Sequence, residues 1–200
     1  METLSIEEPK LIVVITWPSG SGKTSVINQL INDHPELKKV VSTTTREMRN
    51  SEEHGKDRNF VSKKEFDRMK ANGALACIKD DGKNQYGIPK KLDGEVNIID
   101  LDPDGLEKLK DEFSSKIISI ALYQSPEVCD RRMKNRGDSE EDIKRRLDYN
   151  SKRFADINKV KNLLTEDLLD IVCCPKNENI QTTANAIWKV LNIYLAEFAF

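Results

Sequence analysis

The sequence is short of the features that mark secreted, metal-clustered or membrane-spanning proteins. Its 200 residues include four cysteines, with no C-x-x-C pair and no metal-ligand spacing, so neither a disulfide framework nor a zinc site is expected. No apolar run reaches the ~18 residues that a membrane span needs. The opening METLSIEE is acidic and lacks the basic-then-apolar order of a secretory signal. We therefore expect a cytoplasmic protein with reduced thiols and no membrane partner.

An excess of charge of one sign is also missing. The chain has 32 Lys and Arg against 34 Asp and Glu, a net charge of -2, which excludes a globally basic nucleic-acid-binding surface. Aromatic residues make up only 6%, and without a stacking motif no nucleic-acid partner is expected. Val, Ile and Leu are nevertheless spread along the chain. A chain of this length buries about 70% of its unfolded surface, so we expect one globular domain, as a monomer or a homodimer.

Short apolar runs alternate with helical patterns along the chain. Residues 11–16 are β-branched and do not alternate with polar residues, which is typical of a strand buried on both faces. A Pro/Gly/Ser-rich turn follows, and then apolar residues at helical spacing up to Pro35. Strands alternating with helices predict an α/β fold around a parallel sheet. Three further runs each precede an expected helix: 96–99 before 104–113, 116–121 before 126–135, and 170–173 before 180–195.

Two polar segments interrupt this alternation. Residues 42–95 are rich in Thr, Arg, Lys and Gly, with one evident helix over residues 63–71. This segment is expected to leave one strand–helix unit and to return before the next. Residues 136–153 are highly charged, and Ser139 is placed to cap a helix that begins there.

The sharpest motif is WPSGSGKT, which runs from Trp17 to Thr24 between the first strand and the first helix. It fits the phosphate-loop pattern G-x-x-x-x-G-K-[ST] except that Trp17 replaces the first glycine. Gly20 and Gly22 let backbone N–H groups turn toward phosphate oxygens, and the helix adds its positive end. Lys23 supplies a cation for the β- and γ-phosphates. The residues expected around the ATP phosphates are Pro18, Ser19, Gly20, Ser21, Gly22, Lys23 and Thr24.

From this loop onward the chain resembles the guanylate kinase family over nearly its whole length. The family loop reads G-P-S-G-x-G-K-S/T, and its next motif reads S-x-x-T-T-R-x-x-R-x-x-E-x-x-G-x-D-Y-x-F-V-S. Its D-I-D-x-x-G and its lid motif R-x-x-x-R-G…E-E-x-I-x-x-R-L follow in the same order. The matching segments here are PSGSGKT (18–24), STTTREMR (42–49) with Glu52, Gly55, Asp57 and FVS (60–62), YG (86–87), DLD (100–102) with Gly105, and Arg132, RG (136–137), EE (140–141), Ile143 and RL (146–147).

The resemblance implies a fold and an activity. The fold is a P-loop NTPase-type parallel-sheet core with helices on both faces, which carries a nucleoside-monophosphate-binding region and a lid. These parts correspond to the two polar segments described above. The activity is transfer of a phosphoryl group from ATP to GMP or dGMP with Mg²⁺. The core would comprise residues 1–41, 96–135 and 154–200, the monophosphate-binding region residues 42–95, and the lid residues 136–153.

On the acceptor side, the resemblance assigns phosphate binding to two arginines and a tyrosine. Arg46 and Arg49 would bind the acceptor phosphate, and Tyr86 would hydrogen-bond it. Ser42 keeps its place in the family motif, whereas Arg58 stands where the family has a phosphate-binding tyrosine. An arginine can still serve there, because its planar fork binds phosphate oxygens and stays charged.

On the transfer side, the resemblance assigns Arg132, Arg136 and Arg146 to the phosphoryl group in transit. Such transfer needs fixed donors that meet the spreading negative charge. Arg132 and Arg136 are four residues apart and so share one helical face. A solvated surface helix would be the simpler interpretation of the charge run alone, but the phosphate loop favours the functional one. The expected catalytic residues are Lys23, Arg46, Arg132, Arg136 and Arg146.

A magnesium site is expected between the first helix and a later strand end. Thr24 can offer its hydroxyl to Mg²⁺. Asp100 ends an apolar strand, where a carboxylate on the magnesium side lies in an α/β fold. It is expected to bind the ion directly or through water and to belong to the acceptor side. Asp102 or Asp104 is placed to cap the following helix instead.

The departures from the family concern the acceptor base. Counting without gaps from Phe66 to Tyr86, the family's guanine-reading glutamate falls on Cys77. A second base contact, a Ser or Thr two residues after Tyr86 in the family, is Ile88 here. A thiol is a weak hydrogen-bonding group, so the pocket becomes more apolar. Three alternatives therefore stay open: a GMP or dGMP kinase, a phage- or virus-type kinase for dTMP or a 5-modified dUMP, and a non-catalytic guanylate-kinase-like scaffold module.

Overall fold

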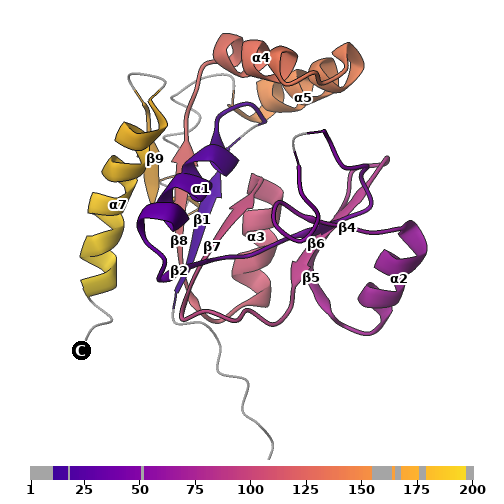
Figure 1. Cartoon of the computed structure of the whole chain (residues 1–200), viewed down its shortest axis with the longest axis horizontal. Helices are drawn as coiled ribbons and strands as arrows, with labels where there is room; N and C mark the ends of the chain where they lie inside the picture. The colour runs from indigo at the N-terminus through magenta and orange to yellow at the C-terminus, as the bar shows by residue number, and fades with distance from the viewer. Residues whose placement is uncertain are drawn as a thin grey trace, which may run out of the picture.

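Two separate β-sheets organise the computed structural model, which describes residues 11–17, 19–50, 52–154, 164, 168–175 and 179–196 (Figure 1). The first sheet has five strands in the order β2-β7-β1-β8-β9, and the second has four in the order β4-β3-β6-β5. The strands and helices are β1 (Leu11–Thr16), α1 (Lys23–Asp33), β2 (Leu37–Lys39), β3 (Thr43–Thr44), β4 (Asn59–Phe60), α2 (Lys63–Ala71), β5 (Leu75–Asp80), β6 (Gln85–Pro89), β7 (Val96–Leu101), α3 (Pro103–Glu112), β8 (Lys116–Leu122), α4 (Pro126–Asn135), α5 (Glu140–Phe154), β9 (Ile171–Cys173) and α7 (Ile180–Ala196).

The five-stranded sheet is parallel throughout and has β1 at its centre, with all six residues of β1 buried. The chain moves one way across the sheet through α1 and the other way through α3. Right-handed crossovers then place α1 and α3 on opposite faces, and α7 packs beside α1 (Figure 1). The predicted α/β fold, a parallel sheet flanked by helices, is confirmed. The strand expected over residues 96–99 continues to Leu101, because Asp100 and Leu101 still pair with Ile15 and Thr16.

The four-stranded sheet lies within residues 42–95, where the sequence predicts only one helix. That helix is α2, whose first turn is capped by Ser62 as its hydroxyl accepts the Glu65 N–H. The strands escaped prediction because β3 and β4 have two residues each and pair with distant segments, such as Thr44 with Tyr86. This sheet is mixed, since β3 pairs with β4 in parallel and with β6 antiparallel.

Helices α4 and α5 share a small apolar core of their own. Cys129 and Met133 of α4 are buried against Ile143 of α5, with Leu147 packed beside them. The Asp142 N–H donates to Ser139 Oγ at 3.2 Å, so Ser139 caps α5 as its sequence position predicts. The two helices lie over one end of the parallel sheet (Figure 1), which is where the phosphate loop also lies.

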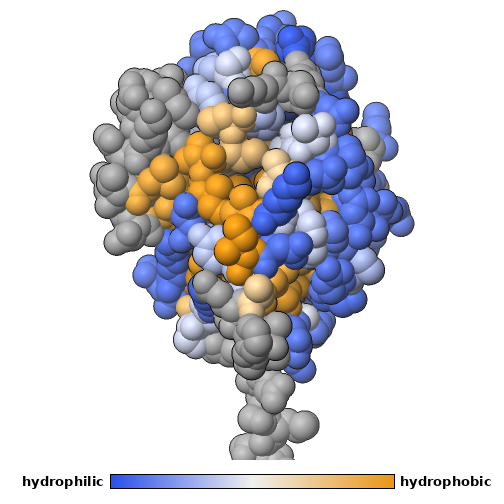
Figure 2. All heavy atoms as spheres, turned by 90° about the vertical axis from the view of Figure 1, so that its left-hand side faces the viewer, coloured by the Kyte–Doolittle hydropathy of each residue, from blue (hydrophilic) through white to orange (hydrophobic). Residues whose placement is uncertain are grey.

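Helix α7 packs on the main core, but some of its apolar residues are exposed to solvent. Ala184, Ile187 and Leu191 pack into the core, whereas Ile193 is 67% exposed and Ile180 43% exposed. Figure 2 shows apolar residues gathered over this side of the molecule. Among the residues described, no helix has the length and apolar content that crossing a membrane requires.

Candidate active site

The phosphate loop joins β1 to α1 at the carboxyl edge of the parallel sheet. Gly20 has φ +88°, and a Cβ there would lie 2.6 Å from the Cys129 carbonyl oxygen, so only glycine fits. Gly22 is the N-cap of α1 and gives it no side-chain cap. Gly22 therefore puts no side chain at the amino end of α1 that would compete with an anion. Pro18, expected in this loop, lies outside the described residues.

Trp17 and Lys23 are in contact at the base of the loop. Trp17 adopts φ 140° in the left-handed region, is 2% exposed, and places its ring 5.6 Å from that of Tyr123. Its carbonyl accepts a hydrogen bond from Lys23 Nζ. Burial lowers the pKa of Lys23, although the charge of Asp100 opposes this shift. Trp17 thus adopts a backbone conformation that favours glycine, while its side chain fills the core.

A pocket of about 260 Å³ borders the loop on the side of α4 and α7. The guanidinium of Arg132 donates to the carbonyls of Ser21 at 2.9 Å and Gly20 at 3.3 Å. The Ser21 hydroxyl is buried without a hydrogen-bond partner among the described residues. An uncapped helix, an arginine and an unpartnered hydroxyl at one pocket fit the phosphates of a nucleotide. The pocket is lined by Ser21, Gly22, Ser25, Val26, Leu122, Gln124, Arg132, Pro175, Ile180 and Thr183.

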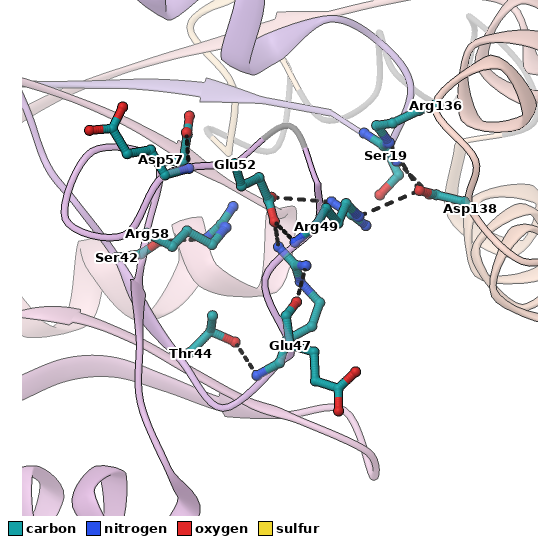
Figure 3. A network of polar contacts seen from close by, with 12 residues as sticks. Ser19, Ser42, Thr44, Glu47, Arg49, Glu52, Asp57, Arg58, Arg136 and Asp138 are labelled. Atoms are coloured by element: carbon teal, nitrogen blue, oxygen red, sulfur yellow. Dashed lines mark hydrogen bonds and ion pairs between the residues drawn. The ribbon is translucent and has the colours of Figure 1, made fainter.

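Asp100 is linked to the four-stranded sheet through Arg58. Arg58 Nη2 donates to Asp100 Oδ2 at 2.9 Å, and its Nη1 donates to the Ser42 hydroxyl. The structure therefore brings these three predicted residues together, and Figure 3 shows Arg58 beside Ser42. Thr24 lies in the first turn of α1, directly after the phosphate loop. Asp100 pairs with Ile15 near the carboxyl end of β1, from which the same loop starts. No group of three His, Cys, Asp or Glu side chains suited to a metal occurs within the described part of the chain.

Glu52 holds the two arginines expected at the acceptor phosphate. Its carboxylate accepts two hydrogen bonds from Arg46 Nη2, at 2.7 and 2.9 Å, and one from the Arg49 N–H at 2.9 Å (Figure 3). Thr44 Oγ1 accepts the Arg46 N–H at 3.1 Å, which fixes the turn after β3. Burial raises the pKa of Glu52, but the hydrogen bonds from Arg46 and Arg49 outweigh it, and the net shift is downward.

Three arginines converge on the carboxylate of Asp138. Arg136 donates to it at 3.0 and 2.5 Å, and Arg49 Nε lies 3.4 Å away (Figure 3). Arg146 Nη1 lies 3.7 Å from the same carboxylate. We call Arg49, Arg136 and Arg146 the arginine cluster. Burial, with repulsion from the neighbouring arginines, lowers the pKa of Arg49 to about 10. The cluster thus unites the monophosphate-side and lid-side arginines that the sequence predicts.

Arg146 contacts the phosphate loop and lies near enough to Tyr86 for its charge to act on the tyrosine hydroxyl. Arg146 Nη1 donates to Ser19 Oγ at 2.8 Å, while its Nε is buried without a hydrogen-bond partner among the described residues. Burial raises the pKa of Tyr86, and the charges of Arg46 and Arg146 act against that shift. The tyrosine hydroxyl therefore lies within the field of these arginines, and a buried unpartnered donor of Arg146 remains for a ligand.

Cys77 and Ile88 lie in the apolar core at 4% and 1% exposure. The β5–β6 pairing shifts register at a bulge next to Cys77, which adopts φ 50°. Two side chains of α3 bind the bulge: Glu112 Oε2 accepts the Cys77 N–H at 2.9 Å, and Lys108 donates to the Ile78 carbonyl. Burial raises the pKa of the Cys77 thiol to about 12. The middle of β5 is therefore fixed against α3.

Glu52 and Asp138 are the two site residues to which the sequence assigns no role. Glu52 stands in the family motif three residues after Arg49, a signal that could have suggested pairing with an arginine. Asp138 has no such signal, because it is one of many acidic residues in the charged segment 136–153. Only the folded chain brings Arg49, 89 positions earlier, to its side.

Comparison with known proteins agrees with this geometry. A model of the guanylate kinase family matches residues 8–182. The guanylate kinase of Caldanaerobacter subterraneus subsp. tengcongensis is 31% identical over 174 residues, which cover 84% of each chain. That of Streptomyces kasugaensis is 36% identical over 143 residues, 68% of this chain and 70% of the relative. The crystal structure of guanylate kinase from Anaplasma phagocytophilum has a TM-score of 0.65 at 27% identity, covering 94% of this chain and 87% of that one. With its phosphate loop and parallel sheet in place, the chain belongs to the guanylate kinase family and is an ATP-dependent nucleoside-monophosphate kinase of the P-loop NTPase fold.

Proposed function

We propose that the chain transfers the γ-phosphoryl group of ATP to GMP or dGMP. The arginine cluster carries this proposal, because it gathers cations from two separate segments around one buried anion, and Arg146 also contacts Ser19 of the phosphate loop. In-line transfer between two polyanions requires such fixed cations at the junction of donor and acceptor. In this proposal residues 42–95 bind the monophosphate, residues 136–153 form the lid, and residues 1–41, 96–135 and 154–200 form the core.

On the donor side, the ATP phosphates lie in the phosphate loop and the nucleoside extends into the neighbouring 260 Å³ pocket. The N–H groups at the start of α1 bind phosphate oxygens, and Lys23 and Arg132 add positive charge. Thr24 and Asp100 would hold Mg²⁺, since hydroxyl and carboxylate oxygens are its usual protein ligands beside nucleotide phosphates. When bound, the ion neutralises phosphate charge and orients the γ-phosphoryl group.

On the acceptor side, the monophosphate binds between Arg46, Arg49 and Tyr86. Glu52 positions both arginines through the hydrogen bonds described above. Arg58, which hydrogen-bonds Ser42 and Asp100, adds a positive charge on the side of the acceptor site that is nearest to β7. As the lid closes, Arg136 and Arg146 meet the charge that develops during transfer, and closure excludes water from the phosphates.

A second candidate acceptor is a deoxypyrimidine monophosphate, dTMP or a 5-modified dUMP. The apolar, buried Cys77 and Ile88 support it, because neither offers the strong acceptor that a guanine edge prefers. GMP remains the first candidate, since the relatives described above are guanylate kinases.

Coupled ATP-consumption assays with GMP, dGMP, dTMP, dUMP and AMP test the proposal. We expect turnover with GMP or dGMP to exceed that with AMP by at least ~10-fold in kcat/KM, which corresponds to about 1.4 kcal/mol. A preference for dTMP or dUMP would select the second candidate. Turnover of none of the five would contradict both.

A further inference from the structure

The carboxylate of Asp138 occupies the centre of the arginine cluster. Its side chain is 3% exposed, whereas those of Arg136, Arg49 and Arg146 are 34%, 26% and 19% exposed. Both oxygens are engaged: Oδ1 by Arg136 Nε and Arg49 Nε, and Oδ2 by Arg136 Nη2 and Arg146 Nη1. No other acidic side chain among the described residues is paired with all three arginines in the structure.

A carboxylate and a phosphate group make equivalent demands on arginine. Each presents anionic oxygens to the planar guanidinium fork, and each is bound best where water is excluded. Three neighbouring guanidinium groups repel one another, so they need an anion among them. Without a nucleotide, the Asp138 carboxylate supplies that anion from within the chain.

Asp138 also joins the lid to the monophosphate-binding region. Two other ion pairs cross the same boundary, from Arg145 to Asp81 at 3.2 Å and from Lys83 to Asp142 at 3.7 Å. Lys83 and Arg145 are 68% and 41% exposed, and exposed pairs contribute little. The buried contact of Asp138 with Arg49 is therefore the stronger link.

We propose that Asp138 is an internal counter-anion that occupies the phosphate-binding arginines in the nucleotide-free enzyme and is displaced by the acceptor phosphate. This inference rests on the proposed function of the arginine cluster. Asp138 is a positioning residue: it holds Arg49, Arg136 and Arg146 together and must move before a phosphate group can take its place. A ligand binds only to molecules in which Asp138 has left the site. The apparent Kd is therefore the intrinsic Kd divided by the fraction of molecules whose site is vacant.

The test is calorimetric titration of GMP, without ATP, into wild type and Asp138→Asn. Asparagine keeps the shape of the side chain but removes its charge. We expect the Kd for GMP to fall at least ~3-fold, because the phosphate no longer displaces an anion. Asp138→Ser, a second neutral variant, should give the same direction if the asparagine variant folds poorly. An unchanged or higher Kd in a folded neutral variant would overturn the inference.

Asp142→Asn is the matched control. It removes a nearby carboxylate, which lies in the first turn of α5 and pairs with Lys83 and Arg145, and the Kd of this variant for GMP should stay within ~2-fold of wild type. A second titration uses inorganic pyrophosphate, a ligand that carries no base. It compares Lys23→Ala with and without Asp138→Asn, because Lys23→Ala weakens binding at the phosphate loop. If GMP does not bind wild type but Asp138→Asn tightens pyrophosphate binding, the acceptor assignment fails and this inference stands. If neither ligand binds more tightly to the variant, this inference fails whatever the acceptor is.

Discussion

Arg146 of α5 donates a hydrogen bond to Ser19 of the phosphate loop at 2.8 Å, across 127 positions of the chain. The same guanidinium faces Asp138 at 3.7 Å and has a buried Nε without a partner among the described residues. One side chain of the arginine cluster therefore contacts the phosphate loop and Asp138 at once. In the proposed function, this cation lies where the phosphoryl group would pass from one nucleotide to the other.

We expect Arg146→Ala to lower kcat by ~10²-fold or more while the acceptor KM changes less than ~3-fold, because Arg146 meets charge that develops in the transition state. Steady-state kinetics with saturating ATP measures both. Arg145→Ala is the control, since Arg145 is 41% exposed and pairs with Asp81 and Asp142. An Arg146→Ala enzyme changed only in KM would show that Arg146 binds resting substrate.

Lys23→Ala should remove phosphoryl transfer and leave the fold intact. Lys23 lies in the loop, and burial already lowers its pKa, so its charge contributes more to anion binding than to folding. We expect kcat to fall ~10²-fold or more and the thermal midpoint to stay at or above that of wild type. Coupled assays and thermal unfolding give the two values. Near-wild-type turnover would contradict the role of this lysine.

Trp17→Gly tests the departure in the phosphate loop. Removing a large buried aromatic side chain costs about 3–5 kcal/mol, and relieving a left-handed non-glycine conformation returns about 1–3 kcal/mol. We expect a net loss of about 2 kcal/mol in the free energy of unfolding, the midpoint of the difference between the two ranges, measured by urea titration. ATP affinity should change less than ~3-fold, because the backbone at this position already follows the glycine conformation. A large loss of ATP affinity with unchanged stability would mean that the indole contacts the nucleotide.

The predictable part of the fold is the part with dense apolar runs. Residues 11–16 have the composition of a buried strand and form one, and the predicted cap at Ser139 is confirmed. The four-stranded sheet could not be predicted, because strands of two residues, such as Thr43–Thr44, have no periodicity to read. Their pairing with Tyr86 and Gly87 depends on closing a long loop, which no local pattern encodes.

The candidate site likewise has one part that the sequence predicts and another that it does not. The phosphate loop can be predicted because its residues are contiguous and each has a separate chemical reason to be there. The arginine cluster could be predicted residue by residue, but not its anion, since Asp138 gains its role only when Arg49 folds next to it. The bulge at Cys77 could not be predicted from the sequence either. The side chains that hydrogen-bond its backbone, Lys108 and Glu112, come from a helix some thirty positions away.

Glu52 should make stability depend on pH in the acid range. Its carboxylate pKa is lowered in the folded chain, so the unfolded chain binds its proton first as the pH falls. The stability from Glu52 is fully present above its ordinary pKa, near 4.5, and is lost as the pH falls through the lower folded value. We expect Glu52→Gln to be less stable than wild type at pH 7, with the difference shrinking below about pH 4. Urea unfolding from pH 7 to pH 3 measures this difference, and Glu53→Gln, at a side chain that is 68% exposed, is the control. A difference independent of pH would contradict the ion pairing.

Cys77→Glu with Ile88→Ser tests how the acceptor base is read. If the two positions face the base, restoring the family's polar groups should raise the ratio of kcat/KM for GMP over dTMP by at least ~10-fold, because a hydrogen bond to a charged group contributes about 1.5–3 kcal/mol.

The structure indicates that Cys77→Glu would also destabilise the fold, which the comparison with the family motif does not show. The Cys77 N–H is bound to Glu112 Oε2 at 2.9 Å, so a new buried carboxylate would lie near an existing one and destabilise the fold. Adding Glu112→Gln should restore stability, since the glutamine oxygen still accepts the N–H without a charge. Urea unfolding and the GMP to dTMP ratio would be measured for the double and the triple variant. A folded triple variant with an unchanged ratio would mean that Cys77 and Ile88 only pack the core, and that another residue reads the base.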